Sequence, residues 1–279
     1  MLKRIGVVTS PYGHYTLEYA LSSIAAAGFR NVELWAASPH YCYADYTPQE
    51  RQQRREEIAA LLRQNGLSMP VLYPEQMNKY TLNIAAAAPH TKKFSMDRIL
   101  EYIDDAQFWG AQSMLLGTGW YHLDDPGPEK YQRSVAAIRQ AAEHAAGRGI
   151  TLLIEPAAPQ TGTFAWDLSS LARLLKDVDS PWVKAGLDTV AMGVAGETPR
   201  QWFETLGRDI VHTHFIDGRP YGHLVWGDGL YPLEKYLDVL NEFGYEGLLG
   251  QEITDGRYFD DPAAADARNF RAFEPFFEN

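Results

Sequence analysis

The chain is poor in cysteine, in positive charge and in long apolar runs. It holds one cysteine, Cys42, among 279 residues, which excludes an intramolecular disulfide and a zinc cluster built from cysteines. Its 25 lysines and arginines face 36 aspartates and glutamates, a formal net charge of −11. Nucleic acid, which is bound by a basic face, is therefore not an expected partner.

Apolar runs are also too short for membrane or secretory segments. No segment approaches the ~20 apolar residues that span a bilayer, and the run Ile5–Val8 is shorter than the apolar core of a secretory signal. We therefore expect a cytoplasmic protein with no membrane partner.

Short β-branched runs alternate with longer amphipathic stretches eight times along the chain. The expected strands are Ile5–Thr9, Asn31–Trp35, Ser68–Tyr73, Gln112–Leu116, Thr151–Glu155, Val183–Asp188, Ile210–Phe215 and Gly247–Glu252. The expected helices are Leu17–Ala27, Gln49–Gln64, Lys92–Trp109, Tyr131–Arg148, Leu168–Lys176, Arg200–Leu206, Leu233–Glu242 and Ala263–Phe277. Such alternation implies parallel strands joined by right-handed crossovers.

Eight units of this kind predict an α/β fold, a single-domain (β/α)8 TIM barrel over residues 1–279. A doubly wound open sheet is the alternative. The glycine fingerprint with which such sheets bind dinucleotides is missing after the first strand, which favours the barrel.

Ionisable side chains end four consecutive expected strands. Glu155, Asp188, His214 and Glu252 come at the ends of strands five to eight, and strand ends meet at one face of a barrel. Three carboxylates crowded together repel one another, and a divalent cation relieves that repulsion. This oxygen and nitrogen set suits Mn²⁺, Co²⁺, Mg²⁺ or Zn²⁺. The alternative for each acid by itself is a helix cap or an ion pair with arginine.

The motifs around these residues occur in a specific order. They are Ile154-Glu155-Pro156, Gly186-Leu187-Asp188, His212-Thr213-His214-Phe215-Ile216-Asp217, Trp226-Gly227-Asp228-Gly229, Gly244-Tyr245-Glu246-Gly247 and Gln251-Glu252. The ordered set resembles the sugar phosphate isomerase/epimerase superfamily, the xylose isomerase-like TIM barrels, over essentially the whole chain. Val32-Glu33-Leu34-Trp35 followed by Pro39-His40 looks most like the ketose 3-epimerases, in particular the fructoselysine type.

The resemblance implies a metal-dependent 3-epimerase or isomerase of a ketose or ketose derivative. Glu155, Asp188, His214 and Glu252 match the family's ligands of one divalent cation, with Mn²⁺ the first choice, and the two glutamates match its acid/base pair. One base on each face of a metal-stabilised cis-enediolate removes and returns the proton. The implied partners are a small sugar and further copies of the chain in a dimer or tetramer.

Further side chains are expected around the sugar or behind the metal. Arg219, His223, Glu33, Trp35, His40 and Trp226 are the expected substrate contacts. His212 lies two residues before His214, on the same side of its strand, and is expected to orient a ligand from behind. A surface ion pair for Arg219, a solvated His223 and a core His212 are the alternatives. The long segment Pro74 to Thr91 is expected to wall or cover the pocket.

Two positions depart from the family pattern and leave the substrate open. Tagatose- and psicose-type epimerases carry a substrate-binding histidine where this chain has Ala191. They and the fructoselysine type carry a second glutamate where it has Thr161 beside Gln160. Related reactions remain alternatives: an aldose–ketose isomerase, an inosose dehydratase, or a lyase acting on a 3-oxo sugar derivative. Abasic-site endonucleases need more histidine ligands than Ala191 allows, and a non-catalytic sugar-binding barrel would not need the glutamate pair.

Overall fold

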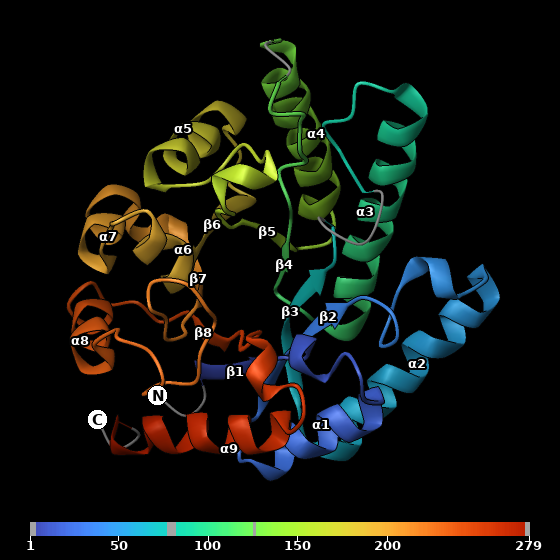
Figure 1. Ribbon diagram of the computed structural model, residues 1–279. Coiled ribbons are helices and arrows are strands. Elements are labelled where there is room, and N and C mark those ends of the chain that lie inside the picture. Colours follow the sequence, from blue (N-terminus) through green and yellow to red (C-terminus); the bar gives the residue numbers. More distant parts are fainter. Residues whose placement is uncertain (1–3, 77–81, 125–126, 277–279) are drawn as a thin grey trace.

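Eight strands close into a parallel barrel in the order of the sequence. The computed structural model describes residues 4–76, 82–124 and 127–276, and within them each strand pairs with its neighbours in the chain while β8 pairs with β1 (Figure 1). The strands are β1 (Ile5–Val8), β2 (Asn31–Ala36), β3 (Ser68–Pro74), β4 (Ser113–Leu115), β5 (Thr151–Ile154), β6 (Val183–Asp188), β7 (Ile210–His214) and β8 (Leu248–Gln251). The predicted TIM barrel is confirmed.

Helices ring the barrel and return the chain from its C-terminal face to its N-terminal face (Figure 1). In the described residues they are α1 (Leu17–Ala26), α2 (Pro48–Asn65), α3 (Pro89–Trp109), α4 (Glu129–Ala146), α5 (Leu168–Val178), α6 (Thr189–Val194), α7 (Pro199–Leu206), α8 (Leu233–Glu242) and α9 (Pro262–Phe273). No helix among these residues is long and apolar enough to cross a membrane.

Local signals place most helix ends. Thr47 and Glu50 form a reciprocal cap at the start of α2, and left-handed Gly66 ends that helix. Helix α6 was not predicted from the sequence. It has six residues, among them valines and a glycine, and is too short to show a helical repeat of apolar residues. Its start is fixed instead by the Asp188 side chain, whose Oδ1 accepts the Ala191 N–H at 2.6 Å.

The C-terminal helix α9 packs on the outside of the barrel, beside α1 (Figure 1). Phe273 is fully buried against the Phe215 ring, with centroids 6.3 Å apart, and Phe270 packs edge-on against Phe29 at 5.1 Å. The segment expected to be helical to residue 277 leaves the α-helix after Phe273, and residue 277 lies outside the described residues.

Helix α9 also contains a buried acid. Asp266 is 1% exposed, and the Tyr12 hydroxyl donates to its Oδ2 at 2.6 Å. Burial raises the pKa of Asp266 to about 7 even though the Tyr12 hydrogen bond lowers it. The folded state therefore holds this proton more tightly than the unfolded chain, whose aspartate pKa is about 3.9.

We predict that Asp266→Asn flattens the pH dependence of stability. A raised folded-state pKa stabilises the fold fully below about pH 4, and that stabilisation disappears as pH rises through about 7. Because asparagine does not ionise, the free energy of unfolding of the variant should rise relative to that of the wild type between pH 4 and 8, by at most on the order of 4 kcal/mol. Urea denaturation across this range measures it. Asp238→Asn, at an exposed position, is the control. If the free energy of unfolding of Asp266→Asn and of the wild type changed equally with pH, the prediction would be refuted.

Candidate metal centre

The four strand-end residues come together at the C-terminal mouth of the barrel. Glu155 follows β5, Asp188 ends β6, His214 ends β7 and Glu252 lies just past β8. The Nδ1 atom of His214 lies 2.7 Å from Oε1 of Glu155 and 3.4 Å from Oε2 of Glu252. Ligand atoms of Glu155, Asp188 and His214 all lie within 4.8 Å of one another. One imidazole nitrogen thus faces two carboxylates, with a third close by.

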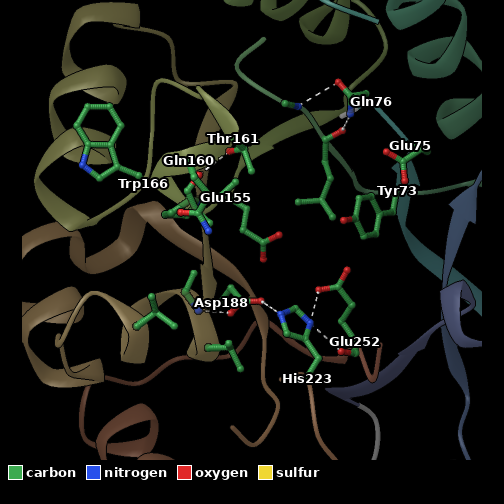
Figure 2. Close-up of a pocket in the computed structure, with 18 of the residues that line it drawn as sticks. Tyr73, Glu75, Gln76, Glu155, Gln160, Thr161, Trp166, Asp188, His223 and Glu252 are labelled. Carbon is green, nitrogen blue, oxygen red and sulfur yellow. Dashed lines mark hydrogen bonds and ion pairs between the residues drawn. The ribbon is translucent and has the colours of Figure 1, made fainter. Parts of the chain in front are cut away.

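His223 joins this group from the loop between β7 and α8. Its Nδ1 lies 3.0 Å from Oε2 of Glu252, and its Nε2 lies 3.7 Å from Oδ2 of Asp188 (Figure 2). Asp188 uses its other oxygen, Oδ1, to cap α6. The helix-cap alternative is thus correct for one oxygen of Asp188, and it leaves Oδ2 directed at the cluster.

The buried donor atoms fit a divalent cation. Oε1 of Glu155 and both ring nitrogens of His214 are buried, and within the described part of the chain they make ion-pair contacts of 2.7–3.4 Å but no well-aligned hydrogen bond. Each such atom costs on the order of 1–3 kcal/mol when nothing satisfies it. Carboxylate oxygens with one imidazole nitrogen are a donor set that Mn²⁺, Co²⁺, Mg²⁺ and Zn²⁺ accept. Glu155, Asp188, His214 and Glu252 would hold such an ion.

The electrostatics of the cluster show the same demand for positive charge. Burial, with Asp188 and Glu252 nearby, raises the pKa of Glu155 to about 7 although His214 opposes the shift. Burial lowers the pKa of His214, but Glu155 and Glu252 outweigh it and hold that pKa well above its usual range. The acids therefore stabilise a cationic ring in their midst, and a metal ion would meet the same need.

A cavity of about 450 Å³ opens above the cluster. Glu155, Asp188 and Glu252 point into it, and Tyr73 lies across it from Glu155, on the side of Glu252 (Figure 2). The Tyr73 ring lies 5.7 Å from the ring of His214. The volume is within the usual range for small-molecule pockets, so the cluster is open to a ligand of sugar size.

Gln76 joins two walls of this cavity. Its amide donates to the Leu115 carbonyl at 3.2 Å, and its oxygen accepts the Gly117 N–H at 3.0 Å. The expected pocket wall from Pro74 to Thr91 thus contributes Pro74, Glu75 and Gln76 to the lining, while residues 77–81 lie outside the described residues.

Of the expected substrate contacts, only His223 is among the described residues that line the cavity. Arg219 is exposed and donates to the Asp228 carbonyl. Trp226 is 5% exposed, and its Nε1 donates to the Phe215 carbonyl at 3.0 Å. Both side chains are engaged in organising the loop after β7.

The expected contacts from the β2 region also lie apart from the described cavity lining. His40 is fully buried, with Nε2 3.1 Å from the Tyr12 carbonyl. The Trp35 indole donates to Oε2 of Glu75 at 3.3 Å, so it contacts a lining residue from behind. Glu33 is fully buried, with Oε2 at 3.4 Å from the Nε2 atoms of both His212 and His214.

Sequence reasoning missed Gln76 and Trp166 as lining residues. Tyr73 ends an expected strand but was given no role. Both departures from the family pattern, Ala191 and Thr161, line the cavity, as does Gln160 beside Thr161. Trp166 stands directly before Asp167, the residue that caps α5, and nothing in its local sequence distinguishes a cavity wall from loop packing. Only the strand-end rule could have found Tyr73.

Comparison with known proteins defines the family. The family model described as xylose isomerase-like TIM barrel matches residues 21–273. The chain belongs to this family. Among its xylose isomerase-like relatives, fructoselysine 3-epimerase of Shigella flexneri is 25% identical over 278 residues, which cover 98% of each chain. The relationship is distant but extends over the full length.

Solved xylose isomerase-like barrels have the same fold. D-psicose 3-epimerase from Clostridium cellulolyticum H10, crystallised with D-tagatose, superposes with a TM-score of 0.79 at 18% identity over 98% of both chains. The 3-keto-D-glucoside 4-epimerase of E. coli gives 0.75 at 16% identity over 97% of this chain and 98% of its own. At these identities the likeness shows the fold alone.

We predict that Mn²⁺ or Co²⁺ stabilises the protein through this cluster. At about 100 times its dissociation constant a ligand of the folded state adds about 2.7 kcal/mol, which raises the melting temperature. Asp188→Asn keeps the α6 cap but loses a charged ligand, so it should bind metal at least about tenfold more weakly. Calorimetric titration of EDTA-treated protein measures this.

The control for the metal prediction is Asp238→Asn on the exposed face of α8, which should bind like the wild type. Equal affinities for wild type and Asp188→Asn would remove the cluster as the binding site.

Proposed function

We propose that this protein is a divalent-metal-dependent 3-epimerase of a ketose or ketose derivative. The observation that carries the proposal is the approach of Glu155 and Glu252 to the same nitrogen of His214 at the floor of the cavity, at 2.7 and 3.4 Å. The two carboxylates come from β5 and from the end of β8, on different sides of the cavity (Figure 2). The family membership supports an enzyme that acts on sugars.

Inversion at carbon beside a carbonyl needs a base on each face of the planar intermediate. One glutamate removes the proton and the other returns it on the opposite face. His223, 3.0 Å from Oε2 of Glu252, orients this carboxylate, and although burial opposes the shift, His214, His223 and Tyr73 lower the pKa of Glu252 to about 2. A divalent cation at the four ligands would supply the positive charge that stabilises the enediolate oxygens.

The same side chains suit neighbouring reactions. An aldose–ketose isomerase, an inosose dehydratase and a lyase acting on a 3-oxo sugar derivative all begin with proton removal beside a carbonyl. Proton exchange in D₂O separates them, because each reaction labels a different carbon or loses water.

Three finer expectations stay predictions. They are Mn²⁺ as the native metal, a homo-oligomer of two or four copies, and a cytoplasmic location.

We predict that Glu155→Gln and Glu252→Gln each lower turnover by about 10²–10⁴-fold or more, because glutamine cannot carry the proton. Both variants should keep the fold, since glutamine has nearly the same shape. The assay is NMR detection of deuterium exchange and epimer formation with added Mn²⁺ or Co²⁺.

Glu143→Gln, on the exposed side of α4, is the matched control and should be fully active. Near-normal turnover by Glu252→Gln would contradict its assignment as an acid/base residue.

The charge of the cavity predicts which sugars it accepts. Its described lining holds Glu75, Glu155, Asp188 and Glu252 but neither lysine nor arginine. A phosphorylated or carboxylated ketose would bring like charge to these acids, whereas a neutral ketose or an amine-bearing one would not. We therefore expect kcat/KM for a ketose to exceed that for its phosphate ester by at least about tenfold. Equal values in side-by-side kinetics at fixed ionic strength would contradict this.

A further inference from the structure

A second buried cluster lies directly behind the metal ligands. Glu33 in β2, His212 and His214 in β7 are 0%, 1% and 0% exposed. Oε2 of Glu33 lies 3.4 Å from Nε2 of His214 and 3.4 Å from Nε2 of His212. The other nitrogen of His214, Nδ1, is the one that faces Glu155 and Glu252.

The barrel makes room for this carboxylate at a specific position. A Cβ atom on Gly250 of β8 would collide with Oε1 of Glu33 and would lie 3.0 Å from Cδ2 of His214. The glycine therefore lets a charged side chain from β2 reach across to the ring. Both Glu33 oxygens are buried and lack a hydrogen-bond partner among the described residues. A buried acid at this location is costly without a donor, and the two imidazoles are the donors it faces.

We propose that Glu33 is a positioning residue of the metal centre, accepting the Nε2–H of His214 so that the Nδ1 lone pair faces the metal ligands. This inference rests on the proposed metal site. An imidazole can bind a cation only through an unprotonated nitrogen, and the partner of the other nitrogen decides which one that is. A carboxylate behind a metal-binding histidine also fixes the plane of the ring.

The 3.4 Å separation is longer than the ~2.9–3.0 Å of a typical N–H···O hydrogen bond. Such bonds are often long without the bound group and tighten when it binds. His212 approaches the same Glu33 oxygen from one layer lower in β7, which restricts the carboxylate from below. Its role is thus to hold Glu33, rather than to contact a ligand of the metal directly.

The first test is metal affinity, measured by calorimetry with Mn²⁺ on EDTA-treated protein. Glu33→Leu should raise the dissociation constant by about 10–100-fold, and Glu33→Gln, which keeps a neutral acceptor, by less. Asp266→Asn is the matched control, a buried acid that bonds to Tyr12 and should bind like the wild type. A wild type that does not bind metal would overturn the metal centre itself, whereas equal affinity in wild type and Glu33→Leu would overturn only the role of Glu33.

The second test reads the hydrogen bond directly and serves if Glu33→Leu fails to fold. In the Zn²⁺-loaded protein with ¹⁵N-labelled histidine, the Nε2–H proton of His214 should resonate far downfield and exchange slowly, because a buried carboxylate accepts it. The signal should move upfield in Glu33→Gln, and His212→Gln separates the two histidine signals. An unchanged His214 signal in Glu33→Gln would overturn the proposal.

Discussion

Three carboxylates gathered around one buried imidazole are the constraint on which the rest of the site depends. Like charges buried at this spacing are strongly unfavourable, and the shifted pKa values of Glu155 and His214 express that conflict. The fold tolerates it because the four residues stand at the ends of neighbouring parallel strands, held by a closed ladder that cannot splay apart. The acids therefore stay crowded, and the site retains its affinity for positive charge.

The same constraint extends below the ligands into the barrel. His214 occupies a layer in which Glu33 of β2 crosses toward β7, and Gly250 of β8 supplies the missing volume. Three strands thus contribute to the environment of one ring. A larger residue at position 250 would displace Glu33, although Gly250 is not among the residues that line the cavity.

The fold and the four strand-end residues were predictable because both follow from local periodicity. Strand and helix patterns set the barrel, and a barrel brings strand ends together wherever they lie in the sequence. Loop residues do not obey such a rule. A ring nitrogen of His40 contacts the backbone carbonyl of Tyr12, and the indole nitrogen of Trp226 donates to the backbone carbonyl of Phe215. Neither partner is adjacent in the sequence. Those partners are set by tertiary packing, so the sequence predicted pocket contacts where the structure has buried polar contacts.

The two walls of the cavity differ in chemistry, and this asymmetry bears on how a sugar would lie in it. The acids and His223 line the floor, while Val190, Ala191, Val194 and Trp166 line one side. The hydroxyl groups of a polyol would find hydrogen-bond acceptors in the acids. An apolar substituent would then contact the side of the cavity that Val190, Val194 and Trp166 line. Where tagatose- and psicose-type enzymes place a histidine, Ala191 provides space instead of a hydrogen bond. Ala191 therefore leaves this side of the cavity apolar, next to Val190 and Val194.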